Sequence, residues 1–205
     1  MLKIGVLISG GGTNLQAIID NIERGCIKGK IQLVISNKKA AYGLERARKA
    51  GIEALYINPK DYKDSQEYNQ RLIEELKARG VELVVLAGYL KILSKDFIQA
   101  FRNRIINIHP SLIPSFCGPG YYGERVHKAV LDYGCRVSGA TVHIVDEGTD
   151  TGPIVLQKCV EVDQDETVES LQKKVLKVEH EILVEAVKLF CEGRIFISGR
   201  QVKIL

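Results

Sequence analysis

The sequence is poor in the residues that hold disulfide scaffolds and zinc sites. Its five cysteines are odd in number and form no CxxC pair, so neither a disulfide framework nor a cysteine-rich zinc site is favoured. They stand at Cys26, Cys117, Cys135, Cys159 and Cys191. The four histidines lie far apart and lack the HExxH spacing, so we expect no metal.

The chain also lacks long apolar runs and long blocks of like charge. No stretch is apolar enough to span a bilayer, and the opening MLKIGVLISGGG has no signal-peptide pattern. We therefore expect a cytoplasmic protein without membrane contact. The net charge of +4 is spread over scattered basic residues, which favours a small anionic ligand over nucleic acid. A chain of 205 residues can bury a good core as one domain or as two closely fused halves.

Short apolar runs alternate with amphipathic stretches in the first hundred residues. The pattern predicts strands over 3–9, 31–36, 53–57 and 81–87. It predicts helices over 13–24, 43–50 and 65–79, each followed by a glycine suited to a left-handed cap. This alternation indicates an α/β class, with a Rossmann-like, mostly parallel twisted sheet and helices on both faces.

The pattern changes after residue 100. It predicts a strand over 105–109, a glycine-rich loop over 115–123, a short helix over 124–133, a hairpin of strands 137–146 and 153–162, and a helix over 167–191 that Thr167 caps. We expect one domain over residues 1–205, in which the half 101–205 completes the sheet begun by the half 1–100.

The first motif is SGGGTNLQAI, residues 9–18, which joins a strand to a helix. Glycines there let backbone amides converge on an anion at the helix N-terminus. A phosphate-loop NTPase would need a lysine, and a dinucleotide loop would need a glycine at Leu15 and an acidic residue after the second strand. With these two loop types excluded, the motif favours a binding site for one phosphate group, with Thr13 and Asn14 as side-chain donors. A purely structural turn is the alternative.

The second motif is IINIHPSLIPSF, residues 105–116. Strand alternation puts Asn107 and His109 on the same face, and Pro110 ends the strand. The pair should therefore lie at the carboxyl edge of the sheet, where ligands bind in parallel α/β folds. The alternative is a buried histidine that satisfies a carbonyl, beside an asparagine that starts a turn.

The third motif is HIVDEGTDTGP, residues 143–153, an acidic loop with Asp146, Glu147 and Asp150. The loop could be only a solvated turn. An aspartate facing a histidine, however, fixes its tautomer and raises its pKa. With no serine or cysteine nucleophile nearby, the three motifs predict acyl transfer without a covalent intermediate. Asn107 would donate to the oxyanion, His109 would move protons, and Asp150 would hold His109 charged.

These three motifs, with SNKKAAYGLERARKAGI and VVLAGYLKILS, resemble the glycinamide ribonucleotide formyltransferases of purine synthesis over about residues 1–190. NIHPSLIP alone is shared by the folate-dependent formyltransferases with this fold. The resemblance implies formyl transfer from the co-substrate 10-formyltetrahydrofolate to the amine of 5′-phosphoribosylglycinamide, without a metal. It further implies a cytoplasmic monomer or homodimer with small-molecule substrates, a nucleotide-phosphate-binding half 1–100, and a folate-binding and catalytic half 101–205.

The resemblance also implies roles for particular residues. The catalytic residues are Asn107, His109 and Asp150, the phosphate-binding residues are Gly12, Thr13 and Asn14, the ribose-binding residue is Glu179, and the folate-binding residues are Leu90, Lys91, Ile92, Leu93, Asn107, Asp146 and Gln66. Two positions depart from the family pattern. Gln66 stands where some relatives carry an arginine that contacts the folate, and Cys117 stands where many carry proline. The loop around Cys117, with its glycines and two tyrosines, is typical of a mobile lid.

Three other functions remain open from the residues. Methionyl-tRNA formyltransferase would add a C-terminal tRNA-binding domain, whereas this sequence stops at Leu205. Formyltetrahydrofolate hydrolase would add an N-terminal regulatory domain, whereas the first strand here begins at residue 3. A non-catalytic phosphate-binding module would have no use for Asn107, His109 and Asp150. We therefore expect the glycinamide reaction.

Overall fold

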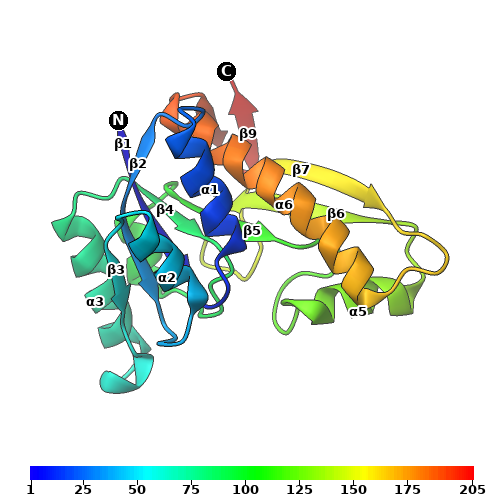
Figure 1. Cartoon of the computed structure of the whole chain (residues 1–205), viewed down its shortest axis with the longest axis horizontal. Coiled ribbons are helices and arrows are strands. Elements are labelled where there is room, and N and C mark those ends of the chain that lie inside the picture. The colour runs from blue at the N-terminus through cyan, green and yellow to red at the C-terminus, as the bar shows by residue number, and fades with distance from the viewer.

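The computed structural model describes all 205 residues and builds them around one seven-stranded sheet, shown in Figure 1. Its strands are β1 (Leu2–Ile8), β2 (Gly29–Ser36), β3 (Ala54–Tyr56), β4 (Leu83–Leu86), β5 (Ile105–His109), β6 (Val137–Ile144) and β7 (Ile154–Glu161). They run in the order β3-β2-β1-β4-β5-β6-β7. The strands from β3 to β5 are parallel, whereas β6 and β7 pair antiparallel, so the α/β class with a mostly parallel sheet is confirmed.

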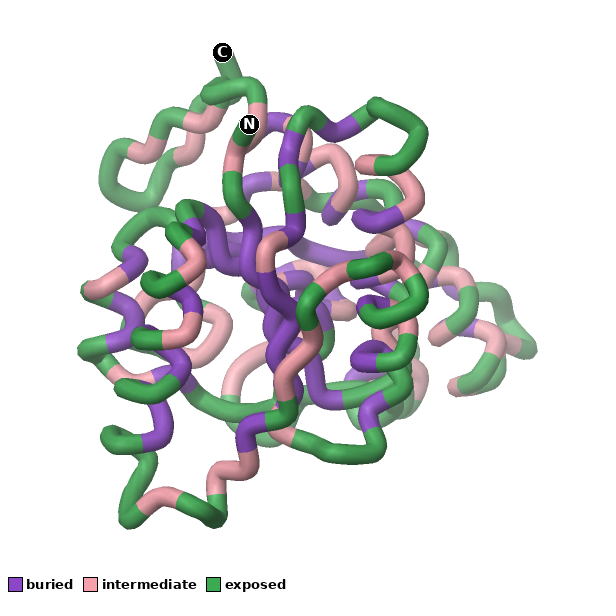
Figure 2. Tube along the Cα trace, turned by 60° about the vertical axis from the view of Figure 1, so that its left-hand side comes forward, coloured by how far each residue is buried: buried purple, intermediate pink, exposed green.

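Helices cover both faces of this sheet. They are α1 (Thr13–Glu23), α2 (Tyr42–Lys49), α3 (Ser65–Ala78), α4 (Lys95–Ala100), α5 (Glu124–Tyr133) and α6 (Val168–Cys191), with a 3₁₀ turn, η1, at Pro59–Asp61. One core cluster joins the sheet to α1, α2, α5 and α6, and the other joins it to α3 and α4. Strand β1 shows why both faces are filled, because Ile4 and Val6 face the first cluster and Leu7 faces the second. Figure 2 shows the buried strands at the centre of the molecule.

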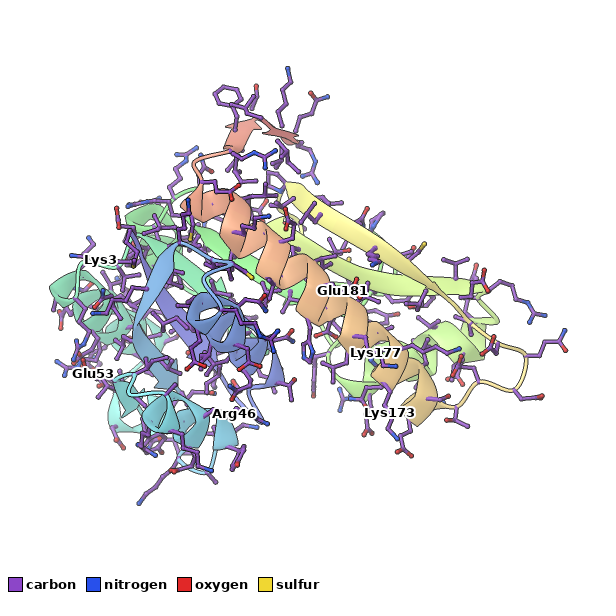
Figure 3. The ribbon with its side chains drawn as sticks, turned by 45° about the horizontal axis from the view of Figure 1, so that its top comes forward. Lys3, Arg46, Glu53, Lys173, Lys177 and Glu181 are labelled. Atoms are coloured by element: carbon purple, nitrogen blue, oxygen red, sulfur yellow. The ribbon has the colours of Figure 1, made fainter.

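The longest helix, α6, lies across the sheet against α1 and β6. Thr167 caps it as the sequence predicts, because its hydroxyl accepts from the Ser170 amide while Ser170 Oγ accepts from the Thr167 amide. Its exposed face carries charged residues four apart, and Figure 3 labels Lys173, Lys177 and Glu181 along it.

Two features differ from the sequence prediction. Helix α4 was not expected, because its six residues are too few for a periodic pattern; Ser94 caps it by accepting from the Phe97 amide. The C-terminal residues form a separate hairpin of β8 (Ile195–Ser198) and β9 (Gln201–Ile204), where no element was predicted. All five cysteines are unpaired, and none of the helices combines the length and apolarity needed to cross a membrane.

Candidate active site

A cavity of about 730 Å³ opens beyond the carboxyl ends of β4 and β5. The strand order reverses between β1 and β4, and such a switch point is where open α/β sheets bind ligands. Most of the residues predicted for the site line this cavity: Asn14, Leu90, Lys91, Ile92, Leu93, Asn107, His109, Asp146, Asp150 and Glu179. Gly12, Thr13 and Gln66 are not among its lining residues. The motifs at the ends of separate strands therefore converge on one concave site.

The loop that follows β5 is fixed by the neighbouring antiparallel strands. Thr141 Oγ1 on β6 donates to the Ser111 carbonyl over 2.6 Å and accepts from the Ile113 amide over 3.1 Å. Gln157 Nε2 on β7 donates to the Ile113 carbonyl over 2.9 Å. Because these contacts are buried or half-buried, the chain leaving His109 has a defined path.

His109 lies between two acceptors. Its Nε2 donates to the Phe116 carbonyl over 2.9 Å, and its Nδ1 lies 3.6 Å from Asp150 Oδ2, which accepts from the Gly118 amide over 3.0 Å. Phe116 and Asp150 both have left-handed backbones, with φ of 50° and 58°, a conformation that costs energy for residues other than glycine. Two strained residues therefore hold the imidazole of His109.

The role of Asp150 in holding His109 charged stays a prediction: Asp150 acts to raise the pKa of His109, but burial is the larger influence. His109 is only 4% exposed, and burial lowers its pKa below the usual value near 6.5, although Asp150 and the Phe116 carbonyl act to raise it. Burial wins because Asp150 lies beyond hydrogen-bond distance from Nδ1. Burial also raises the pKa of Asp150 itself, but its histidine neighbours His143 and His109 and the Gly118 amide bring it below the ordinary value. Burial thus favours the neutral form of the His109 imidazole, and the lowered pKa of Asp150 favours its carboxylate form.

A second histidine, His143, belongs to the site and was missed from the sequence. It lies on β6 directly opposite Asn107, and its Nε2 is 3.1 Å from Asn107 Nδ2 and 3.5 Å from Asp150 Oδ1. Its Nδ1 donates to the Ile144 carbonyl over 2.9 Å. Only the antiparallel register of β6 on β5 reveals this contact, and that register cannot be read from either strand alone.

The segment 90–93, predicted to bind the folate, lines one wall of the cavity. The Leu90 amide donates to Ser9 Oγ over 2.9 Å, so this wall is tied to the end of β1. Leu90 and Ile92 are exposed, whereas Leu93 is buried. Lys91 supplies an exposed cation on the same wall.

Gln66 lies elsewhere, at the start of α3. Its Nε2 donates to Asp96 Oδ2 on α4 over 3.2 Å, and it does not line the cavity. An acidic neighbour also makes this position a poor one for binding a carboxylate.

The acidic loop after β6 closes another side of the cavity. Asp146 Oδ1 accepts from the Gly148 amide over 3.1 Å and from Thr151 Oγ1 over 2.6 Å, which folds the loop into a turn. Lys95 Nζ lies 3.4 Å from Glu147 Oε2 and links the loop to α4. The loop is therefore a defined turn that presents Asp150 to both histidines.

The glycine-rich loop has a structural requirement of its own. Gly12 has φ of 72°, and a Cβ there would lie 2.6 Å from Gly43 Cα, so only glycine lets α1 pack on α2. No side chain caps α1 at Gly12, which leaves its first-turn amides free of side-chain acceptors. Arg46, labelled in Figure 3, donates from Nε to the Gly11 carbonyl over 2.8 Å. The loop can hold an anion, but the need for Gly12 comes from packing.

Polar atoms without partners border the cavity. Asn14 Nδ2 donates to Glu179 Oε2 over 2.7 Å, whereas Asn14 Oδ1 has no partner. Burial raises the pKa of Glu179, and the bond from Asn14 only partly opposes it. His127 Nδ1 is also unpartnered, and burial, together with the charge of His109, lowers the pKa of His127 to about 4. Buried polar atoms normally have partners, so these orphans indicate ligand-binding positions.

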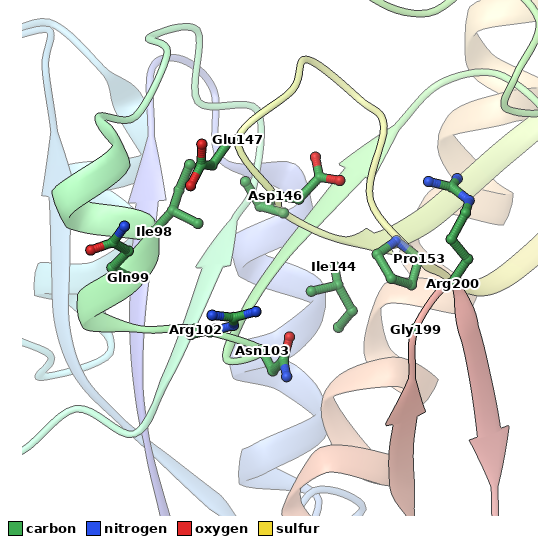
Figure 4. A pocket seen from close by; sticks show the side chains of 11 residues that line it. Ile98, Gln99, Arg102, Asn103, Ile144, Asp146, Glu147, Pro153, Gly199 and Arg200 are labelled. Atoms are coloured by element: carbon green, nitrogen blue, oxygen red, sulfur yellow. The ribbon is translucent and has the colours of Figure 1, made fainter.

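A smaller cavity of about 260 Å³, shown in Figure 4, shares Ile98, Val145, Asp146 and Glu147 with the large one. Arg200, in the turn between β8 and β9, borders it and donates from Nη1 to the Thr151 carbonyl over 2.9 Å. None of Asn107, His109 and Asp150 lines it. No group of three histidine, cysteine or acidic side chains in the molecule could hold a metal ion.

Comparison with known proteins gives a consistent result. The model of the formyl transferase family matches residues 2–187. A phosphoribosylglycinamide formyltransferase of Haemophilus influenzae is 42% identical over 195 residues, which cover 95% of this chain and 90% of that protein. A chloroplastic phosphoribosylglycinamide formyltransferase of Arabidopsis thaliana is 44% identical over 94% of this chain. The chain spans only 66% of the length of that plant protein.

Solved structures agree in fold. The crystal structure of glycinamide ribonucleotide transformylase 1 from Symbiobacterium toebii superposes with a TM-score of 0.95 at 49% identity, covering 100% of this chain and 94% of that one. The phosphoribosylglycinamide formyltransferase of Coxiella burnetii gives a TM-score of 0.92 at 36% identity, covering 99% and 93%. The expected resemblance is therefore confirmed over nearly the whole chain.

Proposed function

Because the chain belongs to the formyl transferase family, we propose that it transfers the formyl group of 10-formyltetrahydrofolate to the amine of 5′-phosphoribosylglycinamide, a step of purine biosynthesis. The observation that carries this proposal is the convergence of Asn107, His109 and Asp150 on one cavity. An amide donor, a neutral imidazole and a carboxylate can together promote acyl transfer without a protein nucleophile.

In the proposed mechanism the neutral amine attacks the formyl carbon, and the carbonyl oxygen becomes an oxyanion that Asn107 Nδ2 stabilises. His109 rests neutral, so its Nδ1 takes a proton from the attacking nitrogen. The imidazolium then has two acceptors in place, the Phe116 carbonyl and Asp150. As the bond from the formyl carbon to the folate nitrogen breaks, the same proton passes to that nitrogen. Both the proton and the formyl group are thus accounted for, and no role is assigned to a metal.

The two substrates are proposed to occupy different parts of the cavity. Gly12, Thr13 and Asn14 would hold the phosphate through the free amides of α1, with Lys38 on the same cavity wall as Asn14. Glu179 would accept from the ribose hydroxyls. These contacts would leave the β5 and β6 side of the cavity to the reacting groups.

The folate is proposed to lie against 90–93 and Asp146. Leu90 and Ile92 expose apolar side chains on this wall, and Lys91 would meet the carboxylates of the folate tail. Gln66 would make at most an outer contact with that tail, since it bonds to Asp96. We further propose a cytoplasmic enzyme that acts as a monomer or homodimer.

Turnover with a spectroscopically active formyl-folate analogue tests the proposal. We expect the absorbance change of deformylation only when phosphoribosylglycinamide is present. Deformylation without the glycinamide would indicate a hydrolase. Binding of both ligands without turnover would indicate a non-catalytic phosphate-binding module. A His109→Ala protein, assayed in parallel, controls for contaminating activity.

A further inference from the structure

We propose that His143 is a positioning residue that fixes which way the Asn107 amide points, and so keeps an N–H donor aimed at the reacting oxygen. This inference rests on the proposed function, because it concerns the oxyanion donor of that reaction. His143 lies opposite Asn107 on the neighbouring strand and lines the same cavity.

The tautomer of His143 follows from its surroundings. The Ile144 carbonyl can only accept, so the His143 Nδ1 that lies 2.9 Å from it must carry a hydrogen. A neutral ring then has a lone pair on Nε2. His143 is only 2% exposed, so water cannot readily replace the partner of that lone pair.

That lone pair determines the orientation of Asn107. The Asn107 amide atom 3.1 Å from Nε2 must be the donor Nδ2, because an amide oxygen would face the lone pair and repel it. Nδ2 has two hydrogens, one of which goes to His143. The other remains available, and Asn107 lines the cavity. Without an acceptor behind it, the amide could rotate and present its oxygen to the developing negative charge.

Asp150 is the competing partner of the same ring nitrogen. Its Oδ1 lies 3.5 Å from His143 Nε2, farther than Asn107 Nδ2. A doubly protonated His143 would pair with Asp150 and would require Asn107 to turn its oxygen toward the ring. His109, the other titratable group nearby, contacts the opposite carboxylate oxygen of Asp150. Because the contact to Asn107 is the shorter one, we assign the neutral form to His143. The neutral form turns the Asn107 nitrogen toward the ring, whereas the doubly protonated form would turn the Asn107 oxygen toward it.

A double-mutant cycle tests the inference. His143→Phe keeps an aromatic ring but removes the acceptor, so kcat should fall by about 10- to 100-fold, up to the cost of losing an oxyanion donor, with both KM values nearly unchanged. His143→Gln retains an acceptor oxygen and should recover part of this loss. In an Asn107→Ala protein, His143→Phe should lower kcat by less than about twofold, because the amide that His143 positions is absent.

Nitrogen NMR of the histidine rings gives a readout independent of turnover. We expect two different ring-nitrogen shifts for His143 at neutral pH, as in a neutral Nδ1–H ring. Two results would overturn the inference. One is a doubly protonated His143, and the other is an equal loss of kcat from His143→Phe in the wild-type and Asn107→Ala proteins. A wild-type protein without turnover would instead overturn the proposed function. If His143→Phe does not fold, His143→Gln and the NMR measurement still decide.

Discussion

His109 combines a low pKa with partners suited to its charged form. Burial disfavours the imidazolium, whereas the Phe116 carbonyl accepts from its Nε2 and the Asp150 carboxylate lies 3.6 Å from its Nδ1. A general base must rest unprotonated and yet be stabilised once it takes the proton. The burial of His109 meets the first requirement and its two acceptors meet the second. The positive φ values of Phe116 and Asp150 are the conformational cost of this arrangement.

Asp150→Asn should separate these two effects at the residue scale. The carboxylate acts to raise the pKa of His109, so its loss should lower that pKa further and move the acid limb of kcat/KM to lower pH. Because the imidazolium loses its charged partner, kcat should also fall by about a hundredfold, with KM changing far less. Histidine titration by NMR in both proteins checks the direction. An unchanged or higher His109 pKa in the variant would mean that Asp150 does not act on His109.

Lys91 and Gln66 make contrasting predictions about the folate tail. Lys91 lines the cavity without a carboxylate partner, so Lys91→Gln should weaken the binding of a glutamate-bearing folate, more at low salt than at high salt. Gln66→Ala should change affinity by less than about twofold, since Gln66 bonds to Asp96. Titration calorimetry of both variants at two salt concentrations measures this. A larger loss of folate affinity in Gln66→Ala than in Lys91→Gln would reverse the assignment.

At the scale of elements, the packing of Gly12 and the proposed binding of phosphate make separate demands on the glycine-rich loop. Gly12 lets the start of α1 lie against Gly43 of α2. At Gly11, by contrast, a Cβ would meet nothing within 4 Å. The packing and the proposed binding of phosphate can therefore be tested separately.

Gly12→Ala should destabilise the fold by more than about 1 kcal/mol, because it adds both a strained φ and a backbone clash. Gly11→Ala should leave the urea midpoint nearly unchanged but raise KM for phosphoribosylglycinamide, because it adds a methyl group to the loop beside the proposed phosphate-binding residues Gly12, Thr13 and Asn14. Urea unfolding and steady-state kinetics on the same preparations distinguish them. Equal KM values for Gly11→Ala and wild type would place the phosphate elsewhere.

Much of this architecture could be predicted from the sequence, because the elements that pack on both sides carry strong periodic patterns. The ends of two strands were predicted correctly, because glycines follow β1 and Pro110 follows β5, and both residue types tend to end strands. The contact between His143 and Asn107 depends on the register between two strands. The left-handed backbone of Phe116 is uncommon for an aromatic residue, and the lowered pKa of His109 depends on burial. None of these three features has a local sequence signal.

At the scale of the whole molecule, the site belongs to neither half alone. The cavity takes Asn14, Lys38 and the wall 88–93 from the first hundred residues. It takes Asn107 and His109 from β5, His143 from β6 and Asp150 from the loop 145–150. The change from parallel to antiparallel pairing at β5 and β6 makes this possible, because it places His143 opposite Asn107. Formation of the whole sheet is therefore needed to assemble the site.

Buried neutral histidines should make the stability of the whole protein depend on pH. His127 has a pKa of about 4 in the fold, below the value near 6.5 of an exposed histidine. The unfolded chain therefore binds this proton first, so the stability from His127 is complete above pH ~6.5 and is lost as the pH falls toward 4. The loss amounts to about 3 kcal/mol.

Urea unfolding between pH 4 and pH 8 measures this dependence. His127→Gln cannot take up the proton, so its free energy of unfolding should fall less steeply below pH ~6.5 than that of wild type. Comparison of the two proteins at pH 8 gives the packing cost of the substitution separately. Parallel pH profiles would mean that His127 is not the group whose burial makes the fold acid-sensitive.

The edge formed by β5 and β6 is proposed to stabilise the transition state of formyl transfer through Asn107. Replacing Asn107 by alanine, with kcat and both ligand dissociation constants measured on the same protein, tests it most directly. We predict that kcat falls by about a hundredfold or more, as for other oxyanion donors, while both dissociation constants stay within about threefold of wild type. An unchanged kcat with weakened binding would contradict the claim and would leave Asn107 as a residue that only positions the substrates.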